Sequence, residues 1–344
     1  MAEMTLNKRH PYYLEDLDSI LSIKGIDSLK GKRVLVTGAT GLIGVHLVDS
    51  LIRLGQVKVL AVGRDANKAR TRLGEYFEHP DFKFIEQDVM TPFAKDLDAD
   101  VIIPLASNTH PLAYSQYPVE TILINVKGAE NALELARRNG ATVLYPSTVE
   151  VYGNSSGQGS FAESDTGKLN LSTSRSCYTE SKRVCEAMCQ SYLSEYGVVS
   201  KIVRLPRVFG PTMLVSDSKA SSQFIKKAVS GEDIVLKSKG EQFFSYIYVS
   251  DAVSALLYVL INGQSGEAYN VSSEGCNVHL KDFARICAEC CGKSVVFELP
   301  STVETRGYSV ADRAILNSSK LEALGFTARY GMKEAIERTV ALLS

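Results

Sequence analysis

The stretch Arg33-Val-Leu-Val-Thr37-Gly38-Ala-Thr-Gly41-Leu-Ile-Gly44 decides the fold of this chain. It starts as a β-branched run typical of a buried strand, passes through three glycines, and enters a segment with apolar residues at helical spacing. A strand that turns tightly into a helix leaves backbone N–H groups free at the helix start, where they bind the phosphates of a dinucleotide. A glycine triplet alone is a weak signal, but its position between a strand and a helix makes it specific.

Further short aliphatic runs follow on the carboxyl side, and helical periodicity separates them. The predicted strands are 57–62, 82–85, 100–104, 142–145 and 200–204. Strands that alternate with helices predict an α/β fold, here a Rossmann-type doubly wound parallel sheet with helices on both faces. After about residue 210 the rhythm becomes looser, which predicts a smaller C-terminal α/β domain for the substrate.

These patterns predict three parts of the chain. Residues 1–31 form an N-terminal extension with one weak amphipathic helix near 14–23, and residues 32–210 form the NAD(P)-binding Rossmann domain with the catalytic residues. Residues 211–344 are mostly substrate-binding, and the segment 246–262 returns to the Rossmann domain.

The composition excludes several classes of partner. The 344 residues are 45% hydrophobic, and 38 basic against 39 acidic residues leave a net charge of -1, so no global field favours nucleic acid or an anionic membrane. No signal peptide and no run of ~20 apolar residues is present, so we expect a cytoplasmic protein. The seven cysteines are then expected to be reduced, and Cys287, Cys290 and Cys291 to pack in a helix, so we expect no metal site.

The end of the second strand bears on the choice of cofactor. Enzymes that prefer NAD usually carry a carboxylate there for the adenosine ribose, whereas this strand ends in Val62-Gly63-Arg64-Asp65. Arg64 favours NADP, because it can pair with a 2′-phosphate, although it could equally be a solvated surface residue. Asp65 could still bind a ribose hydroxyl. Asp88 could accept from the adenine amino group or simply start a loop.

A second group of motifs predicts proton transfer. The fifth strand ends in Pro146-Ser-Thr148-Val-Glu150-Val-Tyr-Gly153, and Tyr178-Thr-Glu-Ser-Lys182 opens a later helix, with both side chains of the pair on one helical face. A lysine ammonium and an oxidised nicotinamide beside the phenol lower its pKa from about 10 toward the working pH. Tyr178 then takes a hydroxyl proton while hydride leaves the same carbon, and Thr148 orients that hydroxyl.

Together with Arg204-Leu-Pro-Arg-Val-Phe-Gly-Pro211, these motifs resemble the extended short-chain dehydrogenase/reductases, in particular their nucleotide-sugar epimerase/dehydratase group. The resemblance covers about residues 32–325. The run 175–183 is especially similar to UDP-glucuronate decarboxylases. The resemblance implies that a tightly bound NAD or NADP oxidises C4 of a nucleotide-diphosphate sugar, that a keto intermediate reacts, and that hydride usually returns. It also implies a homodimer through the helices after the fourth and fifth strands, including 178–196.

Within that resemblance Glu150 indicates the type of reaction. Sugar 4-epimerases of this kind mostly have a small residue there, whereas a carboxylate beside C5 and C6 suits a second proton transfer, in dehydration or in steps around loss of CO2. The alternative is a surface acid at a strand end. Val149 stands where 4,6-dehydratases typically have an aspartic acid, so that reaction lacks its usual acid.

Two further departures concern the anionic part of the substrate. Phe244 stands where the family has an arginine that contacts the diphosphate, and Arg207 replaces the usual asparagine before the Gly-Pro turn. The candidate replacement cations are Arg207, Lys219 and Arg306. Arg306 resembles a late family arginine that reaches the diphosphate or, in decarboxylases, the sugar carboxylate. Each could also be an ordinary surface or packing cation.

We therefore expect a decarboxylase or dehydratase. A 4-epimerase, an NADPH-consuming keto-sugar reductase and a non-catalytic nucleotide-binding scaffold are the alternatives. The predicted catalytic residues are Thr148, Glu150, Tyr178 and Lys182. The predicted cofactor-binding residues are Gly38, Thr40, Gly41, Leu42, Ile43, Gly44, Arg64, Asp88, Val89, Leu105, Ala106, Ser107, Tyr178 and Lys182. The predicted substrate-binding residues are Asn108, Thr148, Arg207, Lys219 and Arg306.

Overall fold

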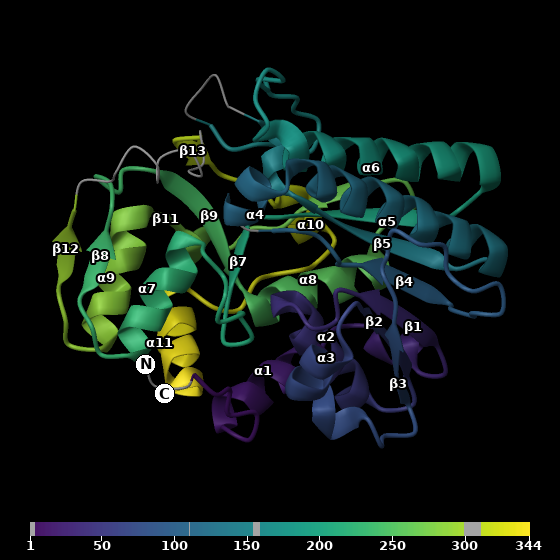
Figure 1. Cartoon of the computed structure of the whole chain (residues 1–344), viewed down its shortest axis with the longest axis horizontal. Coiled ribbons are helices and arrows are strands. Elements are labelled where there is room, and N and C mark those ends of the chain that lie inside the picture. Colours follow the sequence, from purple (N-terminus) through teal and green to yellow (C-terminus); the bar gives the residue numbers. More distant parts are fainter. Residues whose placement is uncertain (1–3, 110, 154–158, 299–310) are drawn as a thin grey trace.

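A seven-stranded parallel sheet forms the centre of the molecule (Figure 1). The structure, a computed structural model, describes residues 4–109, 111–153, 159–298 and 311–344. The strands are β1 (Arg33–Thr37), β2 (Lys58–Gly63), β3 (Phe82–Glu86), β4 (Val101–Pro104), β5 (Thr142–Thr148), β6 (Ser200–Leu205) and β10 (Ala268–Asn270). Their order is β10-β6-β5-β4-β1-β2-β3, so the direction of winding reverses between β1 and β4. The predicted doubly wound Rossmann-type fold is thereby confirmed.

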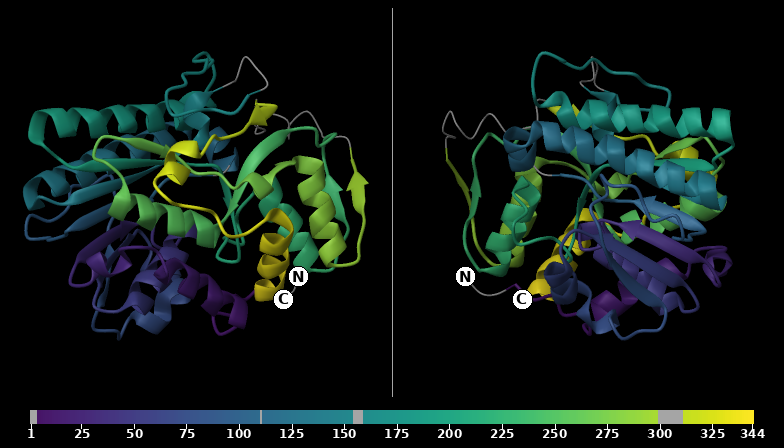
Figure 2. Two further views of the ribbon diagram at one scale, coloured as in Figure 1. Left: turned by 180° about the vertical axis from the view of Figure 1, so that it is seen from behind. Right: turned by 45° about the vertical axis from the view of Figure 1, so that its right-hand side comes forward.

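Helices cover both faces of this sheet. On one face α5 (Pro118–Asn139) and α6 (Ser176–Tyr196) lie side by side, and on the other face α2 (Leu42–Leu54) packs beside α8 (Val249–Asn262) (Figures 1 and 2). The β-branched run of β1 is explained by this sandwich. Val34 and Val36 face the core under α2 and α8, whereas Leu35 faces the core under α5 and α6, and all three are fully buried.

A smaller lobe adjoins the carboxyl ends of the central strands (Figure 2). Its larger sheet combines β7 (Arg207–Phe209), β9 (Phe243–Tyr248), β11 (Asn277–His279) and β13 (Arg313–Ala314), and β8 (Ile234–Leu236) pairs with β12 (Val295–Phe297). The helices of this lobe are α7 (Ala220–Val229), α9 (Leu280–Cys290) and α11 (Met332–Leu343). Cys287 is buried in α9, and the seven cysteines are free thiols.

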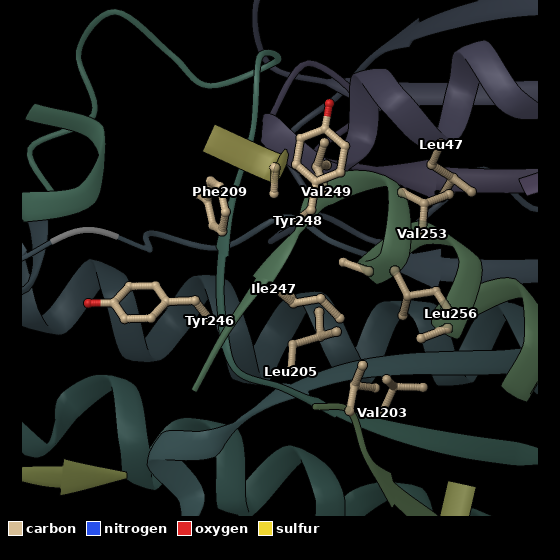
Figure 3. Close-up of a cluster of buried hydrophobic side chains, with 14 of the residues drawn as sticks. Leu47, Val203, Leu205, Phe209, Tyr246, Ile247, Tyr248, Val249, Val253 and Leu256 are labelled. Carbon is tan, nitrogen blue, oxygen red and sulfur yellow. The ribbon is translucent and has the colours of Figure 1, made fainter. Parts of the chain in front are cut away.

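Strand β9 connects the two parts, because it runs directly into α8. Figure 3 shows Ile247 of β9 beside Leu205 in the apolar core that Val253 and Leu256 of α8 share, while Tyr246 points away from that core. Side chains alternate along a strand, so those on one side of β9 pack toward the central sheet, and those on the other side pack within the smaller lobe.

Helix α1 (Pro11–Leu21) lies against α2, α8 and α11. Asp16 is fully buried there, accepts a hydrogen bond from Tyr248 at 2.6 Å, and pairs with Arg338 of α11 at 2.8 Å. The remaining helices are α3 (Ala66–Leu73), α4 (Pro111–Gln116) and α10 (Ser319–Ala323), besides short 3-10 turns. In the part of the chain that the structure describes, no helix combines the length and the apolar character needed to cross a bilayer.

Candidate active site

One cleft at the carboxyl ends of the parallel strands brings the predicted site residues together. It has a volume of about 500 Å3, and its walls come from the loops after β1, β2, β3, β4, β5 and β6 and from the segment before α7. Every predicted cofactor, catalytic and substrate residue within the described ranges lines it. Arg306 lies outside the described residues. This edge of the sheet, at the reversal of winding, is where open α/β sheets bind ligands.

The glycine loop fits the pyrophosphate of a dinucleotide. Gly38 has φ of 63°, and a Cβ there would lie 2.8 Å from the Ala106 nitrogen. A Cβ on Gly44 would collide with the Gly38 carbonyl. Helix α2 begins after Gly41, which offers no side-chain cap, so the first N–H groups of the helix remain open to an anion in the cleft. Gly38 and Gly44 therefore allow the close backbone packing that leaves these N–H groups facing the cleft.

The adenosine end of the cleft contains Arg64 in a mixed electrostatic setting. Its Nη1 lies 3.1 Å from Glu120 and 3.8 Å from Asp88, all of them partly exposed. The Asp65 carboxylate accepts the Lys68 backbone N–H at 2.9 Å and caps α3. Lys68 lines the same end of the cleft, and sequence reasoning missed it.

Tyr178, Thr148 and Lys182 meet at the other end of the cofactor groove. Tyr178 and Lys182 lie on α6 and are 8% and 5% exposed, and Tyr178 hydrogen bonds with Thr148 at the end of β5. The Lys182 ammonium donates to the Pro146 carbonyl at 2.9 Å and lies over the Tyr145 ring. The arrangement places a phenol and a hydroxyl at one point of the wall, where both can reach one substrate oxygen.

The expected lowering of the Tyr178 pKa is not produced by the protein groups. Burial raises the pKa of this phenol above its usual value, and the Glu150 charge raises it further, while the Thr148 hydrogen bond and the Arg175 charge oppose them. Burial also lowers the pKa of Lys182. The neighbouring lysine alone predicts a lowered pKa, but desolvation is the largest effect on a phenol this deep in the cleft.

Glu150 is held by a residue that sequence reasoning did not assign to the site. Arg175 Nη2 lies 3.0 Å from both carboxylate oxygens of Glu150, and the Arg175 guanidinium stacks on the Tyr114 ring at 4.6 Å. The Tyr114 ring in turn stacks on Tyr178, with ring centres 4.9 Å apart. Glu150 is therefore a paired carboxylate in the wall of the cleft, and the same arginine supports the ring beneath Tyr178.

The predicted substrate residues occupy different settings. Asn108 donates to the Thr121 hydroxyl at 3.2 Å, which fixes its side chain to α5. Lys219 pairs with Asp217 at 3.3 Å on the segment before α7. Arg207, on β7, stacks on the ring of Phe244 with its guanidinium carbon 3.4 Å from the ring centre. The arginine at the family's asparagine position thus lies against the phenylalanine at the family's arginine position.

Comparison with known proteins gives one family and a consistent set of relatives. The model of the NAD dependent epimerase/dehydratase family matches residues 34–272. UDP-glucuronic acid decarboxylase 6 of Arabidopsis thaliana is 37% identical over 243 residues, 71% of this chain and 70% of that protein. UDP-glucuronic acid decarboxylase 1 of Xenopus tropicalis is 31% identical over 318 residues, 92% of this chain and 73% of that protein.

Solved structures share the fold at lower identity. A UDP-glucuronic acid 4-epimerase from Bacillus cereus, in complex with UDP-glucuronic acid and NAD, superposes with a TM-score of 0.79 at 20% identity, over 90% of this chain and 98% of that one. A dTDP-glucose 4,6-dehydratase from Streptomyces venezuelae with NAD bound gives a TM-score of 0.78 at 24% identity, over 90% and 96%. These likenesses establish the fold, and the two solved enzymes, an epimerase and a dehydratase, show that it carries more than one reaction.

Proposed function

Because the chain belongs to the NAD dependent epimerase/dehydratase family, it is an enzyme that modifies a nucleotide-diphosphate sugar through a 4-keto intermediate, and we propose that its own reaction is decarboxylation of a nucleotide-activated hexuronate. The observation that carries this choice is Glu150, a carboxylate in the wall of the same cleft as Tyr178 and Thr148. Oxidation at C4 makes the sugar carboxylate a β-keto acid, which loses CO2 readily. Val149 is buried and apolar, so the acid typical of 4,6-dehydratases is missing and dehydration is less favoured.

Each protein group has a definite task in this proposal. When bound, the cofactor accepts hydride from C4 of the sugar and returns it in the last step. Thr148 and Tyr178 bind the O4 hydroxyl, and Tyr178 takes its proton as the hydride leaves. The C5–C6 bond then breaks, CO2 leaves, and the electron pair passes to O4, where the two hydroxyl donors stabilise the enolate. Glu150 passes a proton from solvent water to C5, which replaces the lost carboxylate, and Lys182 holds the nicotinamide ribose.

A 4-epimerase is the second candidate, and a specific contact favours it. Both oxygens of Glu150 are bonded to Arg175, so this carboxylate already has a structural partner. An epimerase needs no proton from Glu150, since it only oxidises, turns and reduces the sugar again. In that case Glu150 would be an anchor for Arg175 and Tyr114.

Product analysis separates the candidates. UDP-glucuronate, UDP-glucose and dTDP-glucose are incubated separately with the cofactor-loaded enzyme, and masses and stereochemistry are read by mass spectrometry and NMR. We expect a UDP-pentose and CO2 from UDP-glucuronate alone, and loss of at least ~100-fold in rate for Tyr178→Phe. A stereoisomer of unchanged mass would rule out decarboxylation. Steady consumption of NADPH with a keto-sugar would indicate a reductase, and full activity of Tyr178→Phe would show that the site is misplaced.

The preference between NAD and NADP is a finer proposal. Supporting NADP, the tip of β2 is Gly63, the Asp65 carboxylate is used as a helix cap, and Arg64 and Lys68 both line the adenosine end. The Arg64 side chain is 54% exposed and its partner Glu120 is 37% exposed, so this ion pair is worth only about 0–1 kcal/mol and a 2′-phosphate can replace it. We expect tighter binding of NADP than NAD, and a reversed order in Arg64→Ala/Lys68→Ala, measured by calorimetry. An unchanged order in that variant would refute the assignment.

We also propose a homodimer through α5 and α6. Val119 and Ile122 on α5 and Val184 on α6 are large aliphatic side chains with exposures of 67%, 41% and 44%, which a partner helix pair could cover. Light scattering should give twice the chain mass. The double substitution Val119→Glu/Ile122→Glu should give a folded monomer with unchanged circular dichroism, and a monomeric parent protein would exclude this arrangement.

A further inference from the structure

Arg207 is a cation in the cleft wall with unused hydrogen-bonding capacity. Its Nη1 is shielded from solvent and has no hydrogen-bond partner among the described residues. No ion pair of Arg207 occurs within the described ranges either, whereas Lys219, which also lines the cleft, is paired with Asp217. A buried guanidinium edge without an acceptor is costly unless a ligand supplies one.

Phe244 explains how this arginine is held without a carboxylate. Strands β7 and β9 are parallel, with Arg207 opposite Tyr246. Phe244 lies two residues before Tyr246 and on the same side of β9, with the two ring centres 6.5 Å apart. Phe244 is only 5% exposed, so its ring is a rigid platform. A ring stacked on one face of a guanidinium leaves the N–H donors in the guanidinium plane free.

The surrounding charges indicate what the free donors face. Glu150 and Arg175 neutralise each other through contacts of 3.0 Å. Arg207 interacts electrostatically with both of these residues and with Tyr114, which lies under Tyr178. With Glu150 and Arg175 paired to each other, Arg207 remains a cation without a matched anion among the described residues near Glu150. Burial lowers the pKa of Arg207, which is the sign expected for a cation that lacks a nearby matched anion.

We propose that Arg207 binds the carboxylate of the sugar and so selects a nucleotide-activated uronate over a neutral hexose. This inference rests on the proposed function, in which the sugar lies against Tyr178. The guanidinium fork matches a carboxylate in two parallel hydrogen bonds. Its position near Glu150 puts it beside the C5–C6 edge of the sugar. Since the carboxylate exists before CO2 is lost, Arg207 acts on substrate binding, and its loss should raise KM far more than it lowers kcat.

Calorimetric binding of three nucleotides tests this assignment. UDP, UDP-glucose and UDP-glucuronate are titrated into the cofactor-loaded parent protein, Arg207→Met and the control Arg313→Met. Arg313 is a matched control because its guanidinium lies 4.7 Å from the ring centre of Phe243, the residue before Phe244 in β9, and Arg313 does not line the cleft. We expect Arg207→Met to weaken UDP-glucuronate binding by ~10- to 100-fold, the scale of one charge-assisted contact, with UDP and UDP-glucose changed less than about twofold. Arg313→Met should change none.

Equal losses of affinity for all three nucleotides would overturn the proposal, because Arg207 would then contact the diphosphate. Unchanged affinity for all three nucleotides would overturn it as well. Phe244→Leu keeps the arginine but removes its platform, so it should give a smaller loss confined to UDP-glucuronate even if Arg207→Met folds poorly. Because binding is measured without turnover, the role of Arg207 in binding the carboxylate is tested separately from the proposed decarboxylation. Uronate selectivity without CO2 release contradicts only the proposed reaction, and CO2 release with an unselective Arg207 contradicts only this inference.

Discussion

At the scale of single residues, the opposite charges of Glu150 and Arg175 both change the pKa of the Tyr178 phenol. Glu150 raises the pKa of the phenol and Arg175 lowers it, on top of the larger effect of burial. The two charged groups are also bonded to each other, so they oppose one another at Tyr178 while both are present. The Tyr178 pKa, on which proton removal from the sugar depends, should therefore fall when Glu150 is neutralised and rise when Arg175 is neutralised.

Charge removal should move the pH dependence of the first hydride transfer in opposite directions. Glu150→Gln removes the charge that raises the Tyr178 pKa, so the phenolate forms at lower pH and the rising limb of the profile moves down by about one pH unit. Arg175→Gln removes the charge that lowers this pKa, so the limb moves up. The measurement is cofactor reduction at 340 nm in a single turnover, which precedes any later role of Glu150.

The matched control for this prediction is Glu180→Gln. Glu180 lies on the same helix, two residues beyond Tyr178, but pairs with Arg183 at 3.7 Å and does not line the cleft. Its removal should leave the pH profile in place. Shifts of the same sign in Glu150→Gln and Arg175→Gln would contradict the electrostatic explanation and point to a general distortion of the site.

At the scale of elements, the junction of β1 and α2 depends on close backbone approach. Gly44 lies in the first turn of α2, where any side chain would meet the Gly38 carbonyl and the Ala39 backbone. The helix can therefore lie on the loop only if this position has no Cβ. The phosphate site and the packing of α2 on the sheet therefore both require a residue without a Cβ at position 44.

Gly44→Ala should affect cofactor binding and stability together. The added methyl group forces α2 away from the loop, so we expect at least a tenfold weaker affinity for NAD or NADP and a free energy of unfolding lower by about 1–3 kcal/mol. Calorimetry and urea unfolding provide the two values. Gly74→Ala is the control, because a Cβ there meets no atom within 4 Å. Unaltered affinity of Gly44→Ala for the cofactor would show that the loop can accept a Cβ at this position, against the close contacts in the structure.

The elements that could be predicted from sequence are those that local pattern specifies. The run 33–37 coincides with β1 because a strand buried on both faces must be aliphatic throughout. Strands β7 and β13, of three and two residues, carry no such periodicity, and the pairing of β7 with β9 depends on residues far apart in the chain. The stack of Arg175, Tyr114 and Tyr178 was missed for the same reason, since Tyr114 and Tyr178 are far apart in the sequence.

At the scale of the whole molecule, α1 joins the central sheet to the smaller lobe. On one side Tyr13 hydrogen bonds with buried Asp49 of α2, and on the other Asp16 pairs with Arg338 of α11. The buried position raises the pKa of Asp16, although Tyr248 and Arg338 oppose the shift. A buried carboxylate of this kind tolerates ionisation only while its cation is present.

Arg338→Met should therefore destabilise the whole molecule. It leaves Asp16 buried without its cation, so we expect the free energy of unfolding at neutral pH to fall by about 3–5 kcal/mol in urea titrations. Asp16→Asn/Arg338→Met should recover part of this loss. Lys333→Met, which breaks an exposed pair with Glu337 on the same helix, should change the value by less than about 0.5 kcal/mol. Equal effects of the two single substitutions would mean that burial of Asp16 does not matter.

The position of α1 also limits how the gene can be shortened for expression. A cloning boundary set at residue 34, where the family match starts, would remove Tyr13, Leu17 and Ile20, whose side chains are at most 5% exposed. The faces of three helices would then meet water, and Asp49 and Arg338 would lose partners at once. Such a trimmed product should collect in inclusion bodies, whereas one that begins before Lys8 should stay in the supernatant.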